Sequence, residues 1–331
     1  MEYRIMTRRS CMKKIVLSLL VVCALCLGAA ALAEAAETVT FSTERGGTIT
    51  VNKDVEEIDL DRLILSRQGN DFNNLAAFIN QLPNLKKLDM FNTEVYAAQV
   101  EMLAAACPQV EFGWTMVIPC TNPLHPERTP HKVRTDQTAF STLHNNQCAL
   151  HSTWDLQILR FCRNLEALDI GHNAVDNLNF LYDLPHLKVL ILGKNNLTDI
   201  TPLGSLKELQ YLELFSNNVT DITPLAGCES LVDLNIANNS IGDFTPLTSL
   251  THLRRLFVYN SAFGSNNGPI SNSITGMLHA ALPGCRIDNA TGGAHGAWRE
   301  HHRYNTLLEM FWERENVPSQ NQKYVPFKNL D

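Results

Sequence analysis

Leucine recurs every 22 residues through the middle of this 331-residue chain, and this spacing constrains the fold more than any other feature. Leu165, Leu187, Leu209, Leu231 and Leu253 mark the period. The clearest segment, LKVLILGKNNLTDITPLGSLKE, begins at residue 187, and the next reads LQYLELFSNNVTDITPLAGCES. A fixed period of this length predicts a solenoid in which each repeat forms one coil and stacks on its neighbours.

Individual positions of the repeat predict local structure. Positions 1, 4 and 6 are apolar, and the alternation at 4 and 6 predicts a short strand with one buried face. Position 9 is asparagine, whose buried amide can bond backbone groups between coils. These asparagines are Asn173, Asn195, Asn217 and Asn239. The Thr-Pro-Leu motif at 201–203, repeated in the next two coils, predicts a short helical turn with threonine as N-cap and proline at the first helical position.

This pattern resembles the leucine-rich repeat family, specifically the 22-residue class seen in bacterial internalins. The resemblance is strong for residues 165–252 and partial elsewhere. It implies an α/β fold, namely a right-handed leucine-rich-repeat solenoid with a concave parallel sheet, short helical turns on the convex side and terminal caps.

The pattern decays on both sides, which divides the chain into four expected regions. They are a signal peptide at 1–35, an N-terminal cap with longer irregular repeats at 36–142, the 22-residue repeats at 143–263 and a C-terminal cap at 264–331. One step back from Leu165 places a degenerate coil at Leu143. The proline-containing stretch 115–135 is interpreted as an inserted loop.

Several elements are expected in the flanking regions. They are a strand or hairpin at 37–51, a strand within 55–60, helices near 72–82, 97–106 and 273–282, and a strand at 285–287. Near the end, Tyr304, Leu307, Leu308, Phe311 and Trp312 are at helical spacing. We expect that helix to cap the open end of the repeat core.

The N-terminus has the features of an export signal. Lys13 and Lys14 precede an apolar run from residue 15 to about 32, and small residues around Ala33 and Ala35 form A-x-A-type cleavage sites. An uncleaved membrane anchor is the alternative, because the run is just long enough to span a bilayer. We favour cleavage near Ala33 or Ala35, a secreted or cell-envelope protein, and no membrane association afterwards.

Net charge restricts the class of partner. Without residues 1–35 the chain carries 22 basic and 32 acidic residues, a net charge of −10. Nucleic acids and anionic membranes are bound by basic patches, so neither is an expected partner.

Six cysteines follow the signal peptide: Cys107, Cys120, Cys148, Cys162, Cys228 and Cys285. Cys162 and Cys228 occupy the same core position three coils apart, roughly 14 Å at about 4.8 Å per strand, too far for a disulfide. We expect them to be small core side chains, as are Cys107 and Cys285. Cys148 could pair with Cys162 in one coil, and Cys120 lies in the inserted loop.

The face of the sheet that carries positions 3, 5 and 7, hereafter the concave face, is the candidate binding site. Exposed aromatic and aliphatic side chains interspersed with charges are typical of interfaces. The candidate partner-binding residues are Asp169, Ile191, Tyr211, Glu213, Phe215, Asp233, Asn235, Arg255, Phe257 and Tyr259. The alternative is that a cap segment or the 115–135 loop folds over them.

Two groups of residues raise the alternative of a metal site. Cys120, His125 and His131 could supply three zinc ligands, but without a second ligand pair a plain loop is favoured. His295, His301 and His302 could touch a metal, although a solvated cap is favoured. No metal or other cofactor is expected.

Catalytic motifs are absent from the sequence: there is no nucleophile elbow, glycine-rich phosphate loop or HExxH. Asp169, Glu213 and Asp233 could bring carboxylates together as in glycosidases, yet polar residues are common on such faces. We therefore expect a non-enzymatic protein that binds a protein, or a glycan, through its concave face. A self-associating envelope protein is the alternative, and a hydrolase or zinc enzyme is less favoured.

Overall fold

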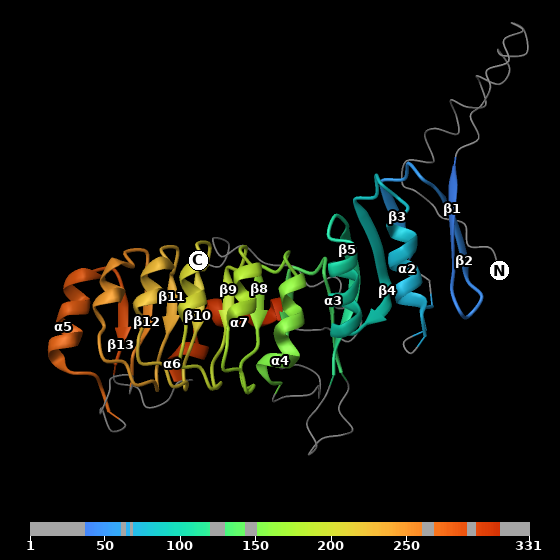
Figure 1. Cartoon of the computed structure of the whole chain (residues 1–331). Helices are drawn as coiled ribbons and strands as arrows, with labels where there is room; N and C mark the ends of the chain where they lie inside the picture. The colour runs from blue at the N-terminus through green and yellow to red at the C-terminus, as the bar shows by residue number, and fades with distance from the viewer. Residues whose placement is uncertain are drawn as a thin grey trace, which may run out of the picture. The chain divides into compact units, whose positions relative to one another are not determined.

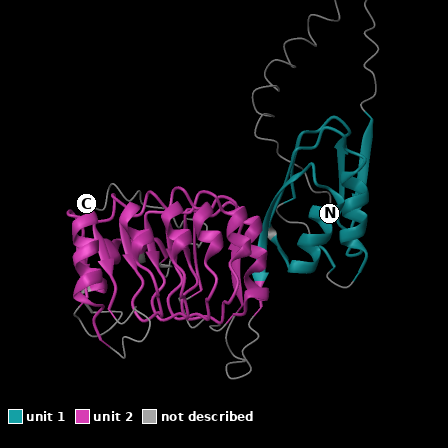
Figure 2. Cartoon of the chain, turned by 60° about the vertical axis from the view of Figure 1, so that its left-hand side comes forward, with its two compact units in different colours: residues 1–117 teal, residues 118–331 magenta. Residues whose placement is uncertain are grey.

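The computed structural model describes residues 37–60, 64–66, 69–119, 130–142, 151–259, 268–289 and 296–311. The chain forms two compact units, residues 1–117 and 118–331 (Figure 2). The expected signal peptide lies outside the described residues.

The first unit combines a hairpin with longer strand–helix repeats. Its elements are β1 (Thr38–Ser42), β2 (Thr48–Asn52), β3 (Glu57–Asp59), α2 (Asp71–Ile79), β4 (Lys87–Val95), α3 (Ala97–Ala106) and β5 (Glu111–Ile118). Strands β1 and β2 pair antiparallel, and β3, β4 and β5 pair in parallel in that order. The expected hairpin, strand and two helices are therefore confirmed. In the 115–135 stretch, β5 extends to Ile118 and β6 begins at His131, so the expected loop is shorter; residues 120–129 are outside the described part.

The second unit is built on a seven-stranded parallel sheet in which the strands follow chain order (Figure 1). The strands are β7 (Ala139–Ser141), β8 (Ala167–Asp169), β9 (Val189–Ile191), β10 (Tyr211–Glu213), β11 (Asp233–Asn235), β12 (Arg255–Phe257) and β13 (Arg286–Asp288); β6 (His131–Arg134) precedes them. In the register, Leu190, Leu212 and Leu234 lie side by side. Because positions 4 and 6 of every repeat are buried, their leucines and isoleucines form a continuous core between the sheet and the returning turns.

The asparagine ladder forms as predicted. The Asn217 amide donates to the carbonyl oxygens of Leu192 and Leu214, at 3.0 and 2.9 Å, and its Oδ1 accepts the Leu197 backbone N–H at 3.1 Å. One side chain thus satisfies buried backbone groups of two coils. The preceding residue, Ser216, has φ 55, a left-handed conformation that recurs one position before each ladder asparagine.

The returning turns are 3₁₀ helices: η2 (Asn179–Asp183), η3 (Thr201–Ser205), η4 (Thr223–Gly227) and η5 (Thr245–Ser249). The prediction that threonine is the N-cap is wrong by one residue. Ile200 is the cap of η3, and Asp199 Oδ1 accepts the Thr201 backbone N–H at 2.8 Å. An aspartate two residues before the turn therefore supplies the acceptor that we had assigned to threonine, and hydrogen bonds from Thr201 lower the pKa of Asp199.

The coil before Leu165 is longer than the period predicts. Ala139 pairs with Ala167, a separation of 28 residues, so the strand lies upstream of the expected start at Leu143. The return path follows as α4 (Thr153–Leu156) and η1 (Gln157–Phe161). Leu156, Leu159 and Cys162 are buried as expected. An insertion in the coil had displaced its strand from the 22-residue step.

Three helices follow the repeats: α5 (Asn272–Ala281), α6 (Gly296–Arg299) and α7 (His302–Phe311). Helix α5 contacts η5, and β13 pairs with β12, so these two elements form the last coil of the stack. The prediction that α7 caps the open end is wrong, because α7 contacts β7, at the other end of the sheet.

The four described cysteines, Cys107, Cys162, Cys228 and Cys285, are buried free thiols. Burial raises the pKa of Cys228 to about 12, which matches the predicted role as a small core side chain. Cys120 and Cys148 lie outside the described residues.

Candidate functional site

The candidate residues of the concave face come from adjacent strands of one sheet, but they do not face solvent. Tyr211, Glu213, Asp233 and Asn235 have no exposed area, and Phe257 is 4% exposed. Asp169, Ile191, Phe215 and Arg255 are also buried, and Tyr259 is half-buried. The expectation that these positions are open to solvent is therefore wrong, and the alternative that a cap segment covers them describes much of this face.

Helices α6 and α7, residues 296–311, lie over the concave face, and we call them the covering segment. Its side chains form one apolar cluster with Ala139, Ala167, Val189, Ile191, Tyr211 and Phe257 from the sheet. The covering side chains are Trp298, Tyr304, Leu307, Met310 and Phe311. The helical spacing of these apolar residues predicted one buried helix face, but not the surface against which it packs.

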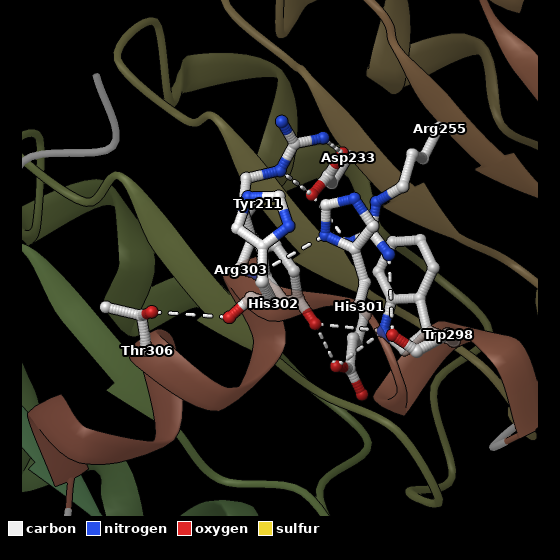
Figure 3. A network of polar contacts seen from close by, with 9 residues as sticks. Tyr211, Asp233, Arg255, Trp298, His301, His302, Arg303 and Thr306 are labelled. Atoms are coloured by element: carbon white, nitrogen blue, oxygen red, sulfur yellow. Dashed lines mark hydrogen bonds and ion pairs between the residues drawn. The ribbon is translucent and has the colours of Figure 1, made fainter. Parts of the chain in front are cut away.

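The indole of Trp298 is the centre of a buried polar network (Figure 3). Its Nε1 donates to Tyr211 Oη at 2.9 Å and to Glu213 Oε1 at 2.8 Å, and the Tyr211 hydroxyl donates to the same carboxylate oxygen. The Tyr211 and Phe257 rings lie 5.4 and 5.2 Å from the indole, centroid to centroid. The concave face therefore holds this indole through both its polar edge and its rings.

Asp233 binds two arginines, one from the sheet and one from the covering segment. Arg303 donates Nε to Asp233 Oδ2 at 3.0 Å and Nη2 to Oδ1 at 2.8 Å, while Arg255 Nη2 donates to Oδ2 at 2.7 Å. The Arg255 guanidinium also lies 4.2 Å from the Trp298 ring centroid. This two-pronged Arg303 contact is the geometry in which guanidinium recognises carboxylate most specifically.

Burial shifts the protonation of the other groups in this region. Desolvation raises the pKa of Asp169 to about 7, against hydrogen bonds from the Gly171 backbone N–H and Ser141 Oγ, both 3.1 Å long. Desolvation also raises the pKa of Glu213. The pKa of His301 falls to about 4 through burial and the nearby Arg255 and Arg303, so its neutral ring accepts the Arg303 backbone N–H.

The remaining candidates lie outside this polar network. Phe215 packs with Ala237 in a separate small cluster, and Asn235 Oδ1 accepts the Ala237 backbone N–H at 3.1 Å. Ile191 belongs to the apolar cluster under the covering segment. Sequence reasoning missed Trp298 and Arg303 altogether. Their signal was present in the stretch WREHHRY, where attention went to the histidines.

The residues considered for zinc do not assemble in the described part of the chain. His131 is buried in β6, 4.9 Å from His151 between ring centroids, whereas Cys120, His125 and His295 are outside the described residues. The rings of His301 and His302 lie 4.3 Å apart. Among the described residues, no group of three His, Cys, Asp or Glu side chains could hold a metal ion.

A family model described as leucine-rich repeats (2 copies) matches residues 185–227. The stacked coils are leucine-rich repeats. The match covers the coils of β9 and β10, and the same parallel sheet extends these leucine-rich repeats on both sides. No curated protein matches the sequence.

Solved structures with a similar arrangement include internalin C2 from Listeria monocytogenes, 20% identical over 72% of this chain and 85% of that chain, with a TM-score of 0.37. Internalin F from the same organism is 22% identical over 74% and 70% of the two chains, with a TM-score of 0.40. The leucine-rich-repeat protein LIC12759 from Leptospira interrogans is 17% identical over 71% and 61%, with a TM-score of 0.40.

Within the described residues, no helix is both long and apolar enough to cross a membrane.

Proposed function

We propose that this chain is an exported, non-enzymatic protein that binds a protein partner through the concave face of its leucine-rich repeats. The observation that carries the proposal is that this face already holds a polypeptide. It binds an indole through Tyr211 and Glu213 and a guanidinium through Asp233. Tryptophan and arginine supply much of the binding energy in protein interfaces, so a face with acceptors for both is suited to protein recognition.

A protein partner is favoured over a glycan because of how this face is composed. Beside the acceptors lie the aliphatic side chains Val189 and Ile191 and the ring of Phe257, which suit apolar and aromatic side chains of a protein. Export is supported by the charged and apolar pattern of residues 13–35, and the net charge of −10 beyond it disfavours nucleic acid.

An affinity capture tests the proposal with three baits, each the chain from about residue 36 to 331. The first bait is unchanged. The second carries Tyr211→Phe and Asp233→Asn, which keep the shapes of the side chains but alter their hydrogen bonds. The matched control carries Trp154→Ala and Tyr182→Ala, two side chains that are 79% and 55% exposed outside the concave face. Cell-envelope and culture proteins bound to each bait are identified by mass spectrometry.

We expect a protein that the first and third baits retain and the second releases. Equal retention on all three baits, or loss only on the third, would contradict binding by the concave face. Recovery of only the bait's own chain would instead support the self-associating alternative.

A further inference from the structure

The covering segment is separate from the core that holds the leucine-rich repeats together. Position-4 and position-6 side chains, such as Leu212 and Leu214, are buried between the sheet and the turns, and the Asn217 amide joins neighbouring coils there. The apolar residues of the covering segment instead cluster with side chains on the other face of the strands. The repeats therefore have a complete core that does not include residues 296–311, and this segment can open as a local unit.

The contact between the segment and the sheet is built as a recognition site. Trp298 fits two hydrogen-bond acceptors and two aromatic rings, and Arg303 fits both oxygens of Asp233. The contact also keeps unfavourable features that a purely structural cover would avoid. Within the described residues, Glu213 Oε2 is buried without a hydrogen-bond partner, and Asp233 is buried together with two guanidinium groups. Burial of such groups opposes closure, whereas replacement by apolar side chains commonly does not.

The geometry of α7 is that of a helix bound in a groove. Tyr304, Leu307 and Met310 are buried on one side, while Asn305 and Glu309 are exposed on the other. A helix of ten residues is marginal by itself in water, so its structure depends on the surface that holds it. Helices that bind grooves in other proteins use the same spacing of anchors.

We propose that the covering segment is an autoinhibitory internal ligand, and that the partner is a protein helix that carries an indole and a guanidinium on one face, as Trp298 and Arg303 are carried. This inference rests on the proposed function. Seven residues connect Asp288, at the end of β13, to Gly296, so the segment is held at high effective concentration over the face. A partner gains the face only as the segment leaves it, and its apparent affinity is lowered by the fraction of molecules that are closed.

Peptide exchange tests this inference without knowledge of the partner. The probe is a fluorescently labelled synthetic peptide of residues 296–311, and its binding to the chain from residue 36 to 331 is followed by anisotropy. The opened variant carries Trp298→Ala and Arg303→Ala. The matched control carries Asn305→Ala and Glu309→Ala on the exposed side of α7. A second peptide with both anchors replaced by alanine tests whether binding depends on the indole and guanidinium.

We expect the opened variant to bind the first peptide at least tenfold more tightly than the unchanged chain or the control, and to bind the second peptide at least tenfold more weakly than the first. Equal binding of the first peptide to all three proteins would refute autoinhibition. Circular dichroism checks that the opened variant keeps its repeats.

Hydrogen exchange of the unchanged chain keeps the inference testable if that variant fails to fold. The α7 amides should exchange at least tenfold faster than those of the β10 strand. Protection equal to that of β10 would show that the segment opens only with the whole fold and would overturn the inference. Peptide exchange without any captured partner would leave the internal ligand standing and reject the proposed function. A captured partner with no peptide exchange would do the reverse.

Discussion

Asp169 makes the stability of this protein depend on pH in an unusual direction. Its carboxyl is 1% exposed, and desolvation raises its pKa from 3.8 to about 7. A raised carboxyl pKa means that the folded chain binds the proton more tightly than the unfolded chain. Its contribution to stability is therefore full below about pH 4, falls as the pH rises toward 7, and stays low above that value.

The size of this effect follows from the pKa difference. Each unit corresponds to about 1.4 kcal/mol, so a shift of roughly three units costs about 4 kcal/mol at pH 8 relative to pH 4. Asp169→Asn removes the ionisation but keeps the shape. The amide oxygen can still accept the Gly171 N–H, and the amide nitrogen can donate to Ser141 Oγ, because a hydroxyl also accepts. We expect the variant to equal the unchanged protein near pH 4 and to exceed its stability by up to about 4 kcal/mol at pH 8.

Urea unfolding followed by circular dichroism, at half-unit steps between pH 4 and 8, measures this difference. Glu213, whose pKa is also raised by burial, and Arg299 lie close enough to interact with Asp169, but both remain in the variant. The difference between the two curves thus isolates Asp169 together with its coupling to them. Curves that stay parallel across the range would refute a buried, proton-binding carboxyl at this position.

Three further substitutions test the repeat core and its outer face. Leu212→Ala removes a fully buried side chain and should lower the free energy of unfolding by about 2–5 kcal/mol; a cost below about half a kcal/mol would contradict the register. Asn217→Leu keeps the volume but leaves three buried backbone groups without partners, which should cost about 2–4 kcal/mol by the same urea assay; a neutral result would deny the ladder a role. Gly193→Ala places a methyl group into the Phe215 ring and should cost about 1–3 kcal/mol, whereas an unchanged midpoint would show that the ring moves freely.

The repeat core was predictable because each of its positions is fixed by a local requirement. Position 4 must fill the coil, and position 9 must bond the backbone where the chain leaves the strand, so the same residue types recur at a fixed period. The method failed where the period itself changed. Between Ala139 and Ala167 the coil contains 28 residues, and a fixed step of 22 placed its strand too late.

Placement of the covering segment could not be read from the sequence for a different reason. The spacing of Tyr304, Leu307 and Phe311 specifies that a helix has an apolar face, but several apolar surfaces of a solenoid could receive it. We chose the end of the stack because repeat cores need a cap there. The last coil, with α5 and β13, fills that place, and α7 packs on the concave face. Charge complementarity between Arg303 and Asp233, residues 70 positions apart, was invisible without the fold.

The strands of the leucine-rich repeats separate two kinds of requirement. Positions 4 and 6 are nearly uniform from coil to coil because the core of each coil must match its neighbours. Positions 3 and 5 on the other side of the same strands include Val189, Tyr211, Asp233 and Arg255 at position 3 alone, and the repeat core explains none of these differences. What they do fit is the indole and guanidinium that lie over them. The side chains of the concave face are therefore best understood as a complementary surface for a polypeptide, which in this conformation is the chain's own.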